Sequence, residues 1–254
     1  MSLVHAEYLK ISRRKVYYVM VLILGFLVAL TAFFLLIFGQ IAPELAEDVP
    51  VLTKPDAYLI GAQQVVGQFW FPLILAVVLI GADLSSTVWA TSLTRDSRKP
   101  AHIGSRLLVI GVASWLAMLL GIAGWAAVVA LGSPGEGSLA IADWLDVVWK
   151  VGLIQVAWVA LGMGAIAMLR SVGPAIGAAI AFSFVENILA LWAPYQNVSL
   201  SAATNGLFDV DIGGAFGPFV PGGDLSQVHA LAIIAGWTLL GLGLTWWGLQ
   251  RRDA

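Results

Sequence analysis

The stretch Val16–Ile41, VYYVMVLILGFLVALTAFFLLIFGQI, decides the fold because it is almost wholly apolar and carries no charge. A bilayer core is about 30 Å thick, so a helix needs about 20 apolar residues to cross it. Five further stretches reach that length: Ala57–Ala82, Leu107–Leu131, Val147–Leu169, Val172–Pro194 and Val228–Leu249. The sequence therefore predicts an all-α integral membrane protein with six transmembrane helices, in a single domain over residues 1–254.

The composition excludes several other classes of protein. Hydrophobic residues make up 60% and charged residues 11% of the chain, whereas soluble domains carry about 25% charged residues. The absence of cysteine excludes disulfides, thiolate metal sites and cysteine nucleophiles. His5, His102 and His229 are scattered, which is atypical of metal ligands. We expect this chain to bind no metal, cofactor or nucleic acid.

The charges predict the orientation in the membrane, because lysine and arginine are enriched in cytoplasmic loops near span ends. They lie before the first span, between the second and third, between the fourth and fifth, and after the sixth: Lys10, Arg13, Arg14, Lys15, Arg95, Arg98, Lys99, Arg106, Arg170, Arg251 and Arg252. The alternate loops are acidic, with only Lys54 and Lys150 as cations. We expect a multi-pass protein of a prokaryotic plasma membrane with both termini in the cytoplasm.

Residues 2–15 predict an amphipathic elbow helix at the membrane surface. Val4, Tyr8 and Ile11 recur at helical spacing, and the basic cluster that follows suits anionic headgroups. Glu7 interrupts the apolar face, so a plain basic flank of the first span is the alternative.

The polar segment 83–106 between the second and third spans is too long for a simple turn. Asp83, Ser85 or Ser86 can cap a short helix, and Pro100 can close that segment before the third span. A charged cytoplasmic helix between two membrane helices can transmit force from a soluble partner. The alternative is a solvated connector.

The order of residues in this loop resembles a known family. Asp83, Ser86-Thr87, Leu93, Ser97-Arg98 and Arg106 follow the order acid, Gly-Thr, leucine, Ser-Arg and basic residue. That order is found in permease subunits of type-2 (type V) ABC exporters. The chain departs from it twice, with aspartate for the commoner glutamate and serine for glycine. The short turn Leu169-Arg170-Ser171 is also similar to that family.

The resemblance implies a half-transporter: two permease copies or paralogues pair in the bilayer, and each rests on a separate ATPase subunit that binds ATP and Mg. This chain itself is not expected to be an enzyme, because no Gly-x-x-x-x-Gly-Lys-[Ser/Thr] phosphate cradle occurs in it. The resemblance implies that the loop docks on the ATPase. The implied coupling residues are Asp83, Ser86, Thr87, Leu93, Arg95, Ser97, Arg98 and Arg106.

The outer segment 195–227 is too apolar for an ordinary solvated loop. Backbone at membrane depth must be helical or shielded by protein, so we expect a re-entrant hairpin of short helices between the fifth and sixth spans. The resembled family has such a hairpin over its exit. An extracellular loop packed on its own helices is the alternative.

Glu186, with Asn187, is the one acidic site well inside a span. A carboxylate there costs several kcal/mol unless it is neutralised, paired or faces water. We predict that Glu186 belongs to the pathway or gate, where it contacts a cationic substrate or grips the re-entrant segment. A structural glutamate that is protonated or hydrogen-bonded is an equally weighted alternative.

Two stripes of small residues predict close helix contacts within the chain: Gly173-x-x-x-Gly177 with Ala181, and Ala113-x-x-x-Ala117-x-x-x-Gly121. A membrane-embedded enzyme is disfavoured because His-Glu-x-x-His and Gly-x-Ser-x-Gly are absent. An ion-coupled secondary transporter or channel subunit is the alternative function, supported by Glu186. No residue chooses the substrate.

Overall fold

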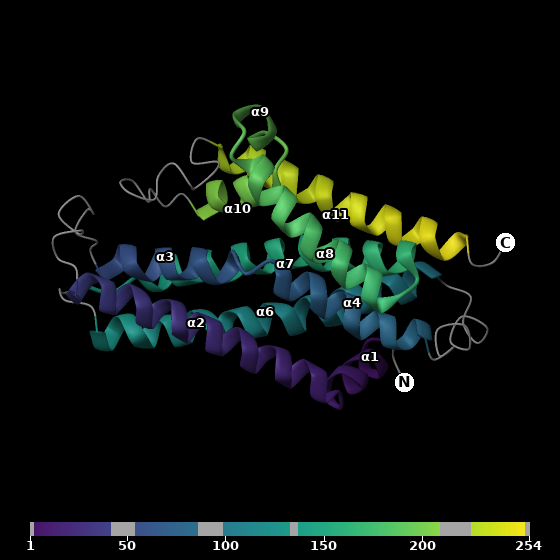
Figure 1. Cartoon of the computed structure of the whole chain (residues 1–254), viewed down its shortest axis with the longest axis horizontal. Helices are drawn as coiled ribbons and strands as arrows, with labels where there is room; N and C mark the ends of the chain where they lie inside the picture. Colours follow the sequence, from purple (N-terminus) through teal and green to yellow (C-terminus); the bar gives the residue numbers. More distant parts are fainter. Residues whose placement is uncertain (1–2, 42–53, 86–98, 133–136, 209–224, 252–254) are drawn as a thin grey trace.

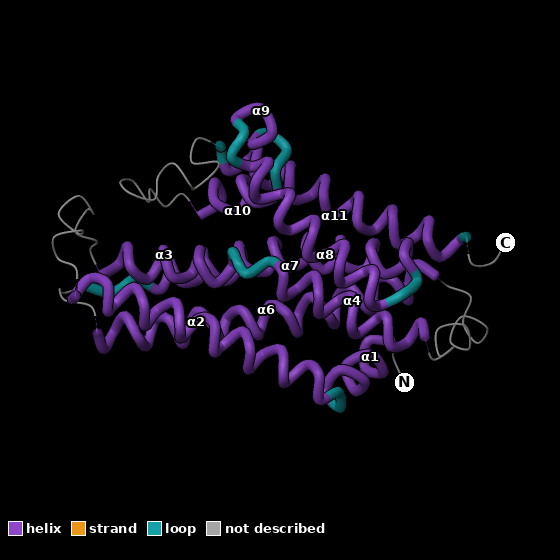
Figure 2. Tube along the Cα trace, viewed as in Figure 1, coloured by secondary structure: helices purple, strands orange, loops and turns teal. Residues whose placement is uncertain are grey.

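A computed structural model describes residues 3–41, 54–85, 99–132, 137–208 and 225–251. These residues form helices joined by short turns, without a strand among them (Figure 2). The helices, labelled as in Figure 1, are α1 (Leu3–Ser12), α2 (Lys15–Ile41), α3 (Lys54–Val66), α4 (Trp70–Ser85), α6 (Lys99–Gly132), α7 (Ile141–Leu169), α8 (Val172–Ala190), α9 (Ala193–Gln196), α10 (Leu200–Phe208) and α11 (Gln227–Gln250).

Six helical segments in the described ranges are long and apolar enough to cross a membrane: Lys15–Phe33, Lys54–Asp83, Pro100–Leu131, Ile141–Leu169, Val172–Ala190 and Gln227–Gln250. They coincide with the six predicted spans. The predicted all-helical fold with six apolar helices is therefore confirmed, and it is the architecture of a multi-pass membrane protein.

The second span is broken into two helices. α3 ends at Val66 and α4 begins at Trp70. Pro72 explains the break, because it has no N–H to donate to the carbonyl of Gln68 and its ring would clash with that carbonyl in a continuous helix. The sequence predicts one uninterrupted span over Ala57–Ala82, and the break at Pro72 corrects this prediction.

Two other boundaries differ from the prediction. α6 begins at Lys99, with Pro100 in its first turn, where a missing N–H costs nothing. The proposed coupling segment is therefore helical at both ends, and Arg106 lies inside α6 instead of in a loop. α8 ends at Ala190, before Pro194, because proline cannot pair with the carbonyl four residues earlier.

α7 is the central helix of the bundle. Its most apolar window is 72% buried, against 22% for α2 and for α8. It packs along α11 and also against α4, α6 and α8. The approach of α7 to α11 requires glycine, because a Cβ on Gly241 would lie 2.5 Å from the carbonyl carbon of Ala160.

The two predicted small-residue stripes behave differently. Ala117 is buried, and a Cβ on Gly121 would lie 3.0 Å from Cγ1 of Val65, so the α6 stripe forms the predicted contact. A Cβ on Gly173 or Gly177 would meet no atom of the described chain within 4 Å. The prediction that the α8 stripe packs within the chain is therefore wrong for the described residues, because spacing alone does not say which face of a helix has a neighbour.

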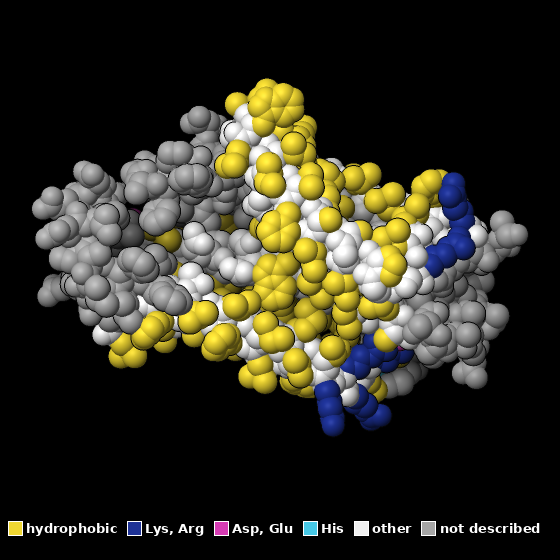
Figure 3. Space-filling view, viewed as in Figure 1, with side chains coloured by type: hydrophobic (Ala, Val, Ile, Leu, Met, Phe, Trp, Pro, Cys, Tyr) yellow, Lys and Arg dark blue, Asp and Glu magenta, His cyan; other side chains and the backbone are white. Residues whose placement is uncertain are grey.

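Both chain ends lie at the same end of the bundle (Figure 1). The space-filling view shows apolar side chains along the length of the bundle, whereas Lys and Arg side chains gather where α1 meets α2 and near the C-terminus (Figure 3). On this face, the described surface is therefore mainly apolar, and its Lys and Arg side chains lie toward the end that carries the termini.

Candidate functional site

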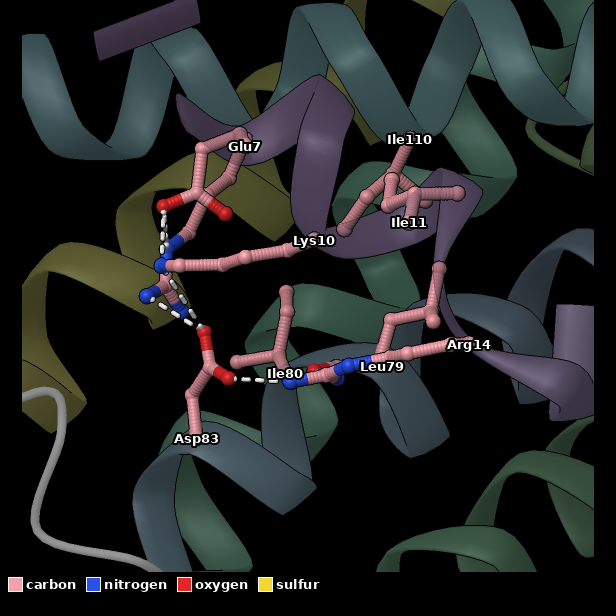
Figure 4. Close-up of a pocket in the computed structure, with 9 residues that line it drawn as sticks. Glu7, Lys10, Ile11, Arg14, Leu79, Ile80, Asp83 and Ile110 are labelled. Atoms are coloured by element: carbon pink, nitrogen blue, oxygen red, sulfur yellow. Dashed lines mark hydrogen bonds and ion pairs between the residues drawn. The ribbon is translucent and has the colours of Figure 1, made fainter. Parts of the chain in front are cut away.

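Five charged side chains from three parts of the chain meet where α1 lies against the ends of α4 and α6 (Figure 4). Asp83 comes from the last turn of α4, and Arg106 from near the start of α6. Glu7 and Lys10 come from α1, and Arg14 lies in the turn that joins α1 to α2. We refer to these five residues as the charge cluster.

The carboxylate of Asp83 is the centre of the charge cluster. Its Oδ2 lies 2.8 Å from Nη2 of Arg106 and 3.5 Å from Nζ of Lys10. Its Oδ1 lies 2.5 Å from Nη2 of Arg14. Glu7 closes the cluster, because its Oε1 accepts a hydrogen bond from Lys10 at 2.8 Å and lies 3.5 Å from Nε of Arg106.

The ion pair between Arg106 and Asp83 is buried. The side chains of Arg106 and Asp83 are 2% and 5% exposed, whereas those of Lys10 and Arg14 are 32% and 27% exposed. Losing one partner of a buried pair is costly, because the other charge is left uncompensated away from water. Moving α4 away from α6 at this point would therefore cost free energy, because it would separate the buried charges of Asp83 and Arg106.

Helical spacing brings the α1 residues to one face. Glu7 and Lys10 are three residues apart, a separation that places side chains on the same side of a helix. Arg14, in the turn after α1, reaches Asp83 from the end of that helix. Arg14 also donates a hydrogen bond from Nη1 to the carbonyl oxygen of Leu79 at 2.5 Å. Ile11, on the same helix, is buried. α1 is therefore fixed to the bundle by both charged and apolar contacts.

The charge cluster surrounds too little space for a substrate. The cavity between its side chains has a volume of about 10 Å³, no more than one water occupies. Leu79, Ile80 and Ile110 form its apolar walls. The chemistry available here is electrostatic attachment of three helices, with no space for a reacting molecule.

Only part of the predicted coupling set lies within the described residues. Asp83 and Arg106, 23 positions apart, are brought into direct contact. The other predicted members lie outside the described residues: Ser86, Thr87, Leu93, Arg95, Ser97 and Arg98. Sequence reasoning missed Lys10 and Arg14 as partners of Asp83 and Glu7 as a partner of Arg106, although the three-residue spacing of Glu7 and Lys10 was a usable signal.

Glu186 forms a second polar junction, between α8 and the start of α10. Its side chain is buried. Its Oε1 accepts hydrogen bonds from Oγ of Ser199 at 2.7 Å and from the backbone N–H of Ser201 at 3.1 Å, and its Oε2 accepts one from Oγ of Ser201. Asn187 does not join it, because its Nδ2 donates to the carbonyl of Ser183 one turn earlier in α8.

The segment held by Glu186 also contacts α11 and α3. Nε1 of Trp237 donates to the carbonyl oxygen of Val198 at 2.7 Å. Nε2 of Gln63 donates to Oδ1 of Asn205, in α10, at 2.9 Å. Together with the Glu186 contacts, these bonds tie the region from Val198 to Asn205 to three long helices. Most of α10 is buried as a result.

Tyr195 lies in α9 beside this junction. Burial raises the pKa of its phenol, and the negative charge of Glu186 raises the pKa further. The neutral phenol is therefore favoured at this position.

The described residues contain no group of three or more His, Asp or Glu side chains placed to hold a metal ion. Comparisons with known proteins do not identify the chain: no protein-family model matches it, and no curated protein is similar enough in sequence to match.

Proposed function

We propose that this chain is the membrane-spanning subunit of an ATP-driven ABC exporter, working as a dimer with separate ATPase subunits in a prokaryotic plasma membrane. The observation that carries the proposal is the charge cluster. Asp83 and Arg106 flank the segment 86–98, and both are joined to α1 by ion pairs. The two helices on either side of the proposed docking loop are thereby coupled to a third.

This arrangement suits the transmission of force. A movement of residues 86–98 acts on α4 and α6 together, because separating Asp83 from Arg106 would leave buried charges unpaired. α1 follows them through Lys10 and Arg14. Closure of the partner ATPase would thus move a rigid set of helices, as in other domain-closure mechanisms.

We also propose that α1 is the elbow helix, lying at the cytoplasmic surface, with both termini on that side. The supporting observation is the gathering of Lys and Arg side chains at the end of the bundle that carries both termini (Figure 3). Such a bias is typical of the cytoplasmic side of a membrane protein.

At the outer side, we propose that α9 and α10 are part of a re-entrant hairpin that gates release. α10 is short and largely buried, as backbone at membrane depth must be when it does not span the bilayer. Its anchor on α8 is Glu186. This supports the gripping role over direct contact with a cationic substrate, because the carboxylate oxygens are already engaged by serine donors.

The open face of α8 supports a pair of permease subunits. Gly173 and Gly177 meet no neighbour in the described chain, and the exposed side chains of Ile180, Phe184 and Ile188 continue along that helix. Small residues allow membrane helices to approach closely. We propose that a second permease copy or a paralogue packs here.

An ion-coupled secondary transporter or channel subunit is the second candidate. Buried Glu186 is the observation that favours it, because intramembrane carboxylates often mark ion pathways. In that function, transport would require an ion gradient and no ATPase.

The two candidates are separated by purifying the chain together with the products of its neighbouring genes. For the exporter, an ATPase subunit co-purifies, and its ATP hydrolysis rises when this chain is present. Asp83→Asn should reduce that stimulation, whereas Asp143→Asn, which removes an exposed charge at the start of α7, should not. Transport into liposomes driven by an ion gradient alone would reject the exporter.

Because the chain has no cysteine, its orientation can be measured with single introduced cysteines. Arg98→Cys should react with a membrane-impermeant reagent only from the cytoplasmic side. Labelling of Arg98→Cys from outside the cell would overturn the proposed topology and, with it, the docking of residues 86–98 on an ATPase.

A further inference from the structure

A groove runs between α1, α2 and α6 on the outer surface of the bundle. Its volume is about 640 Å³, within the range of about 300–1,000 Å³ typical of sites for small ligands. Its walls are mainly apolar and aromatic and include Tyr8, Tyr17, Tyr18, Leu108, Val112 and Leu116. We refer to it as the α1–α6 groove.

The groove faces outward from the bundle. Tyr8 and Leu108 are more than half exposed, and Leu116 is nearly so. In a bilayer, such an apolar surface is in contact with acyl chains or with another protein. Two tyrosine hydroxyls are already used within the chain, since Tyr17 donates to the carbonyl of Ala113 and Tyr18 to that of Ser12. The walls therefore offer mainly apolar contact.

Two exposed cations lie in sequence between residues that line the groove. Arg13 and Lys15 are exposed in and beside the turn between α1 and α2, next in sequence to the lining residue Ser12 and close to Tyr17. Neither makes an ion pair within the described part of the chain, in contrast to Lys10 and Arg14 of the charge cluster. An apolar groove with two cations beside it in sequence is complementary to an amphiphile with an anionic head.

We propose that the α1–α6 groove binds an anionic phospholipid of the cytoplasmic leaflet. One acyl chain lies along Tyr8, Leu108 and Val112, and the phosphate lies against Arg13 and Lys15. The choice of the cytoplasmic leaflet rests on the proposed position of α1 at the cytoplasmic surface, whereas the lipid site itself does not rest on an ATPase partner.

The groove has a physical connection to the charge cluster. Ile11 of α1 lines both the α1–α6 groove and the small cavity inside the cluster. A lipid that fills the groove therefore supports α1 from the side opposite Asp83 and Arg106. Bound lipid would thereby hold α1 in the position in which its charges reach α4 and α6.

The test is native mass spectrometry of the purified full-length chain, titrated in detergent with phosphatidylglycerol or phosphatidylcholine. We expect one phosphatidylglycerol to bind at concentrations at which phosphatidylcholine does not. The double variant Arg13→Gln/Lys15→Gln should weaken phosphatidylglycerol binding about tenfold to thirtyfold. Equal binding of the two lipids, or unchanged binding by the double variant, would overturn the proposal.

Matched variants separate the groove from general effects of charge and bulk. Arg170→Gln/Arg251→Gln removes two exposed cations that are remote in sequence from the groove and should leave binding unchanged. Val112→Trp should block binding because it fills the groove, whereas Leu120→Trp, on an exposed position of α6 outside the lining, should not. Loss of binding in either control variant would contradict the assignment.

A second copy of the chain is the competing occupant of the groove. A photo-crosslinking residue in place of Leu108, activated in vesicles of phosphatidylglycerol and phosphatidylcholine, distinguishes the two. The expected product is a crosslink to phosphatidylglycerol. A crosslinked pair of protein chains as the main product would overturn the lipid site.

Discussion

Asp83 is the residue whose replacement tests the charge cluster most directly. Asp83→Asn removes the negative charge that faces Arg106, Arg14 and Lys10 while keeping the shape of the side chain. Breaking a buried ion pair costs about 3–5 kcal/mol. The contacts to the partly exposed Arg14 and Lys10 contribute about 0–1 kcal/mol each. Because asparagine can still accept one hydrogen bond, we expect a loss near the low end, about 3 kcal/mol of unfolding free energy.

The measurement is reversible unfolding of the purified chain in mixed micelles, followed as the fraction of denaturing detergent is raised. Asp143→Asn is the control, because Asp143 is exposed and accepts a hydrogen bond from the backbone N–H of Ala140 at 3.0 Å, which asparagine can also accept. Its expected loss is below about 1 kcal/mol. Double-mutant cycles measure the interaction free energy of each pair. We expect a larger value for Asp83 with Arg106, at 2.8 Å, than for Asp83 with Lys10, at 3.5 Å.

The reasoning would be refuted if Asp83→Asn lost less than about 1 kcal/mol, the range of surface pairs. A coupling of Asp83 with Lys10 as large as that with Arg106 would also refute it, because the argument depends on burial of the Arg106 pair. In either case the ion pairs of the charge cluster would contribute too little free energy to hold α1 against α4 and α6.

Three further predictions concern other parts of the molecule. Glu186→Gln should abolish transport in reconstituted vesicles while leaving assembly intact by gel filtration, and normal transport would exclude a gating role for the carboxylate. Gly241→Ala should lower the unfolding free energy by about 1–3 kcal/mol, because its Cβ would meet the backbone of Ala160, whereas Gly243→Ala, with no atom within 4 Å, should be neutral. Because the pKa of the Tyr195 phenol is raised in the folded chain, the unfolded chain loses the phenol proton at a lower pH than the folded chain does. The contribution of Tyr195 to the free energy of unfolding is therefore complete below about pH 10 and is lost as the pH rises above it. Tyr195→Phe should reduce this alkaline fall in stability, measured by unfolding at a series of pH values.

The apolar runs predicted the helices well because length and lack of charge are local properties of the chain. Val16–Ile41 nearly coincides with α2, and the third to sixth predicted spans each match one long helix, whereas the second is divided between α3 and α4. The errors lie at prolines. Pro72, Pro100 and Pro194 each set a boundary that a count of apolar residues does not detect.

The candidate sites were predictable only in part, because a site depends on which helices become neighbours. Asp83 and Arg106 were singled out by the loop that they flank, and they are in contact. Glu7 was interpreted as an interruption of an apolar face, whereas it faces the charge cluster. In the same way, the sequence does not indicate a role for Gly241, whereas in the structure it permits a close approach of α11 to α7.

The two polar junctions are connected by direct helix packing. α4 carries Asp83 and packs against α8, which carries Glu186. Their contact is tight at Gly81, where a Cβ would lie 2.4 Å from Cγ2 of Val172 in the first turn of α8. A displacement of α4 at its charged end therefore acts directly on α8, and α8 is hydrogen-bonded through Glu186 to the start of α10. In the proposed exporter, a displacement of α4 near Asp83 would therefore reach Glu186 and α10 through a single intervening helix, α8.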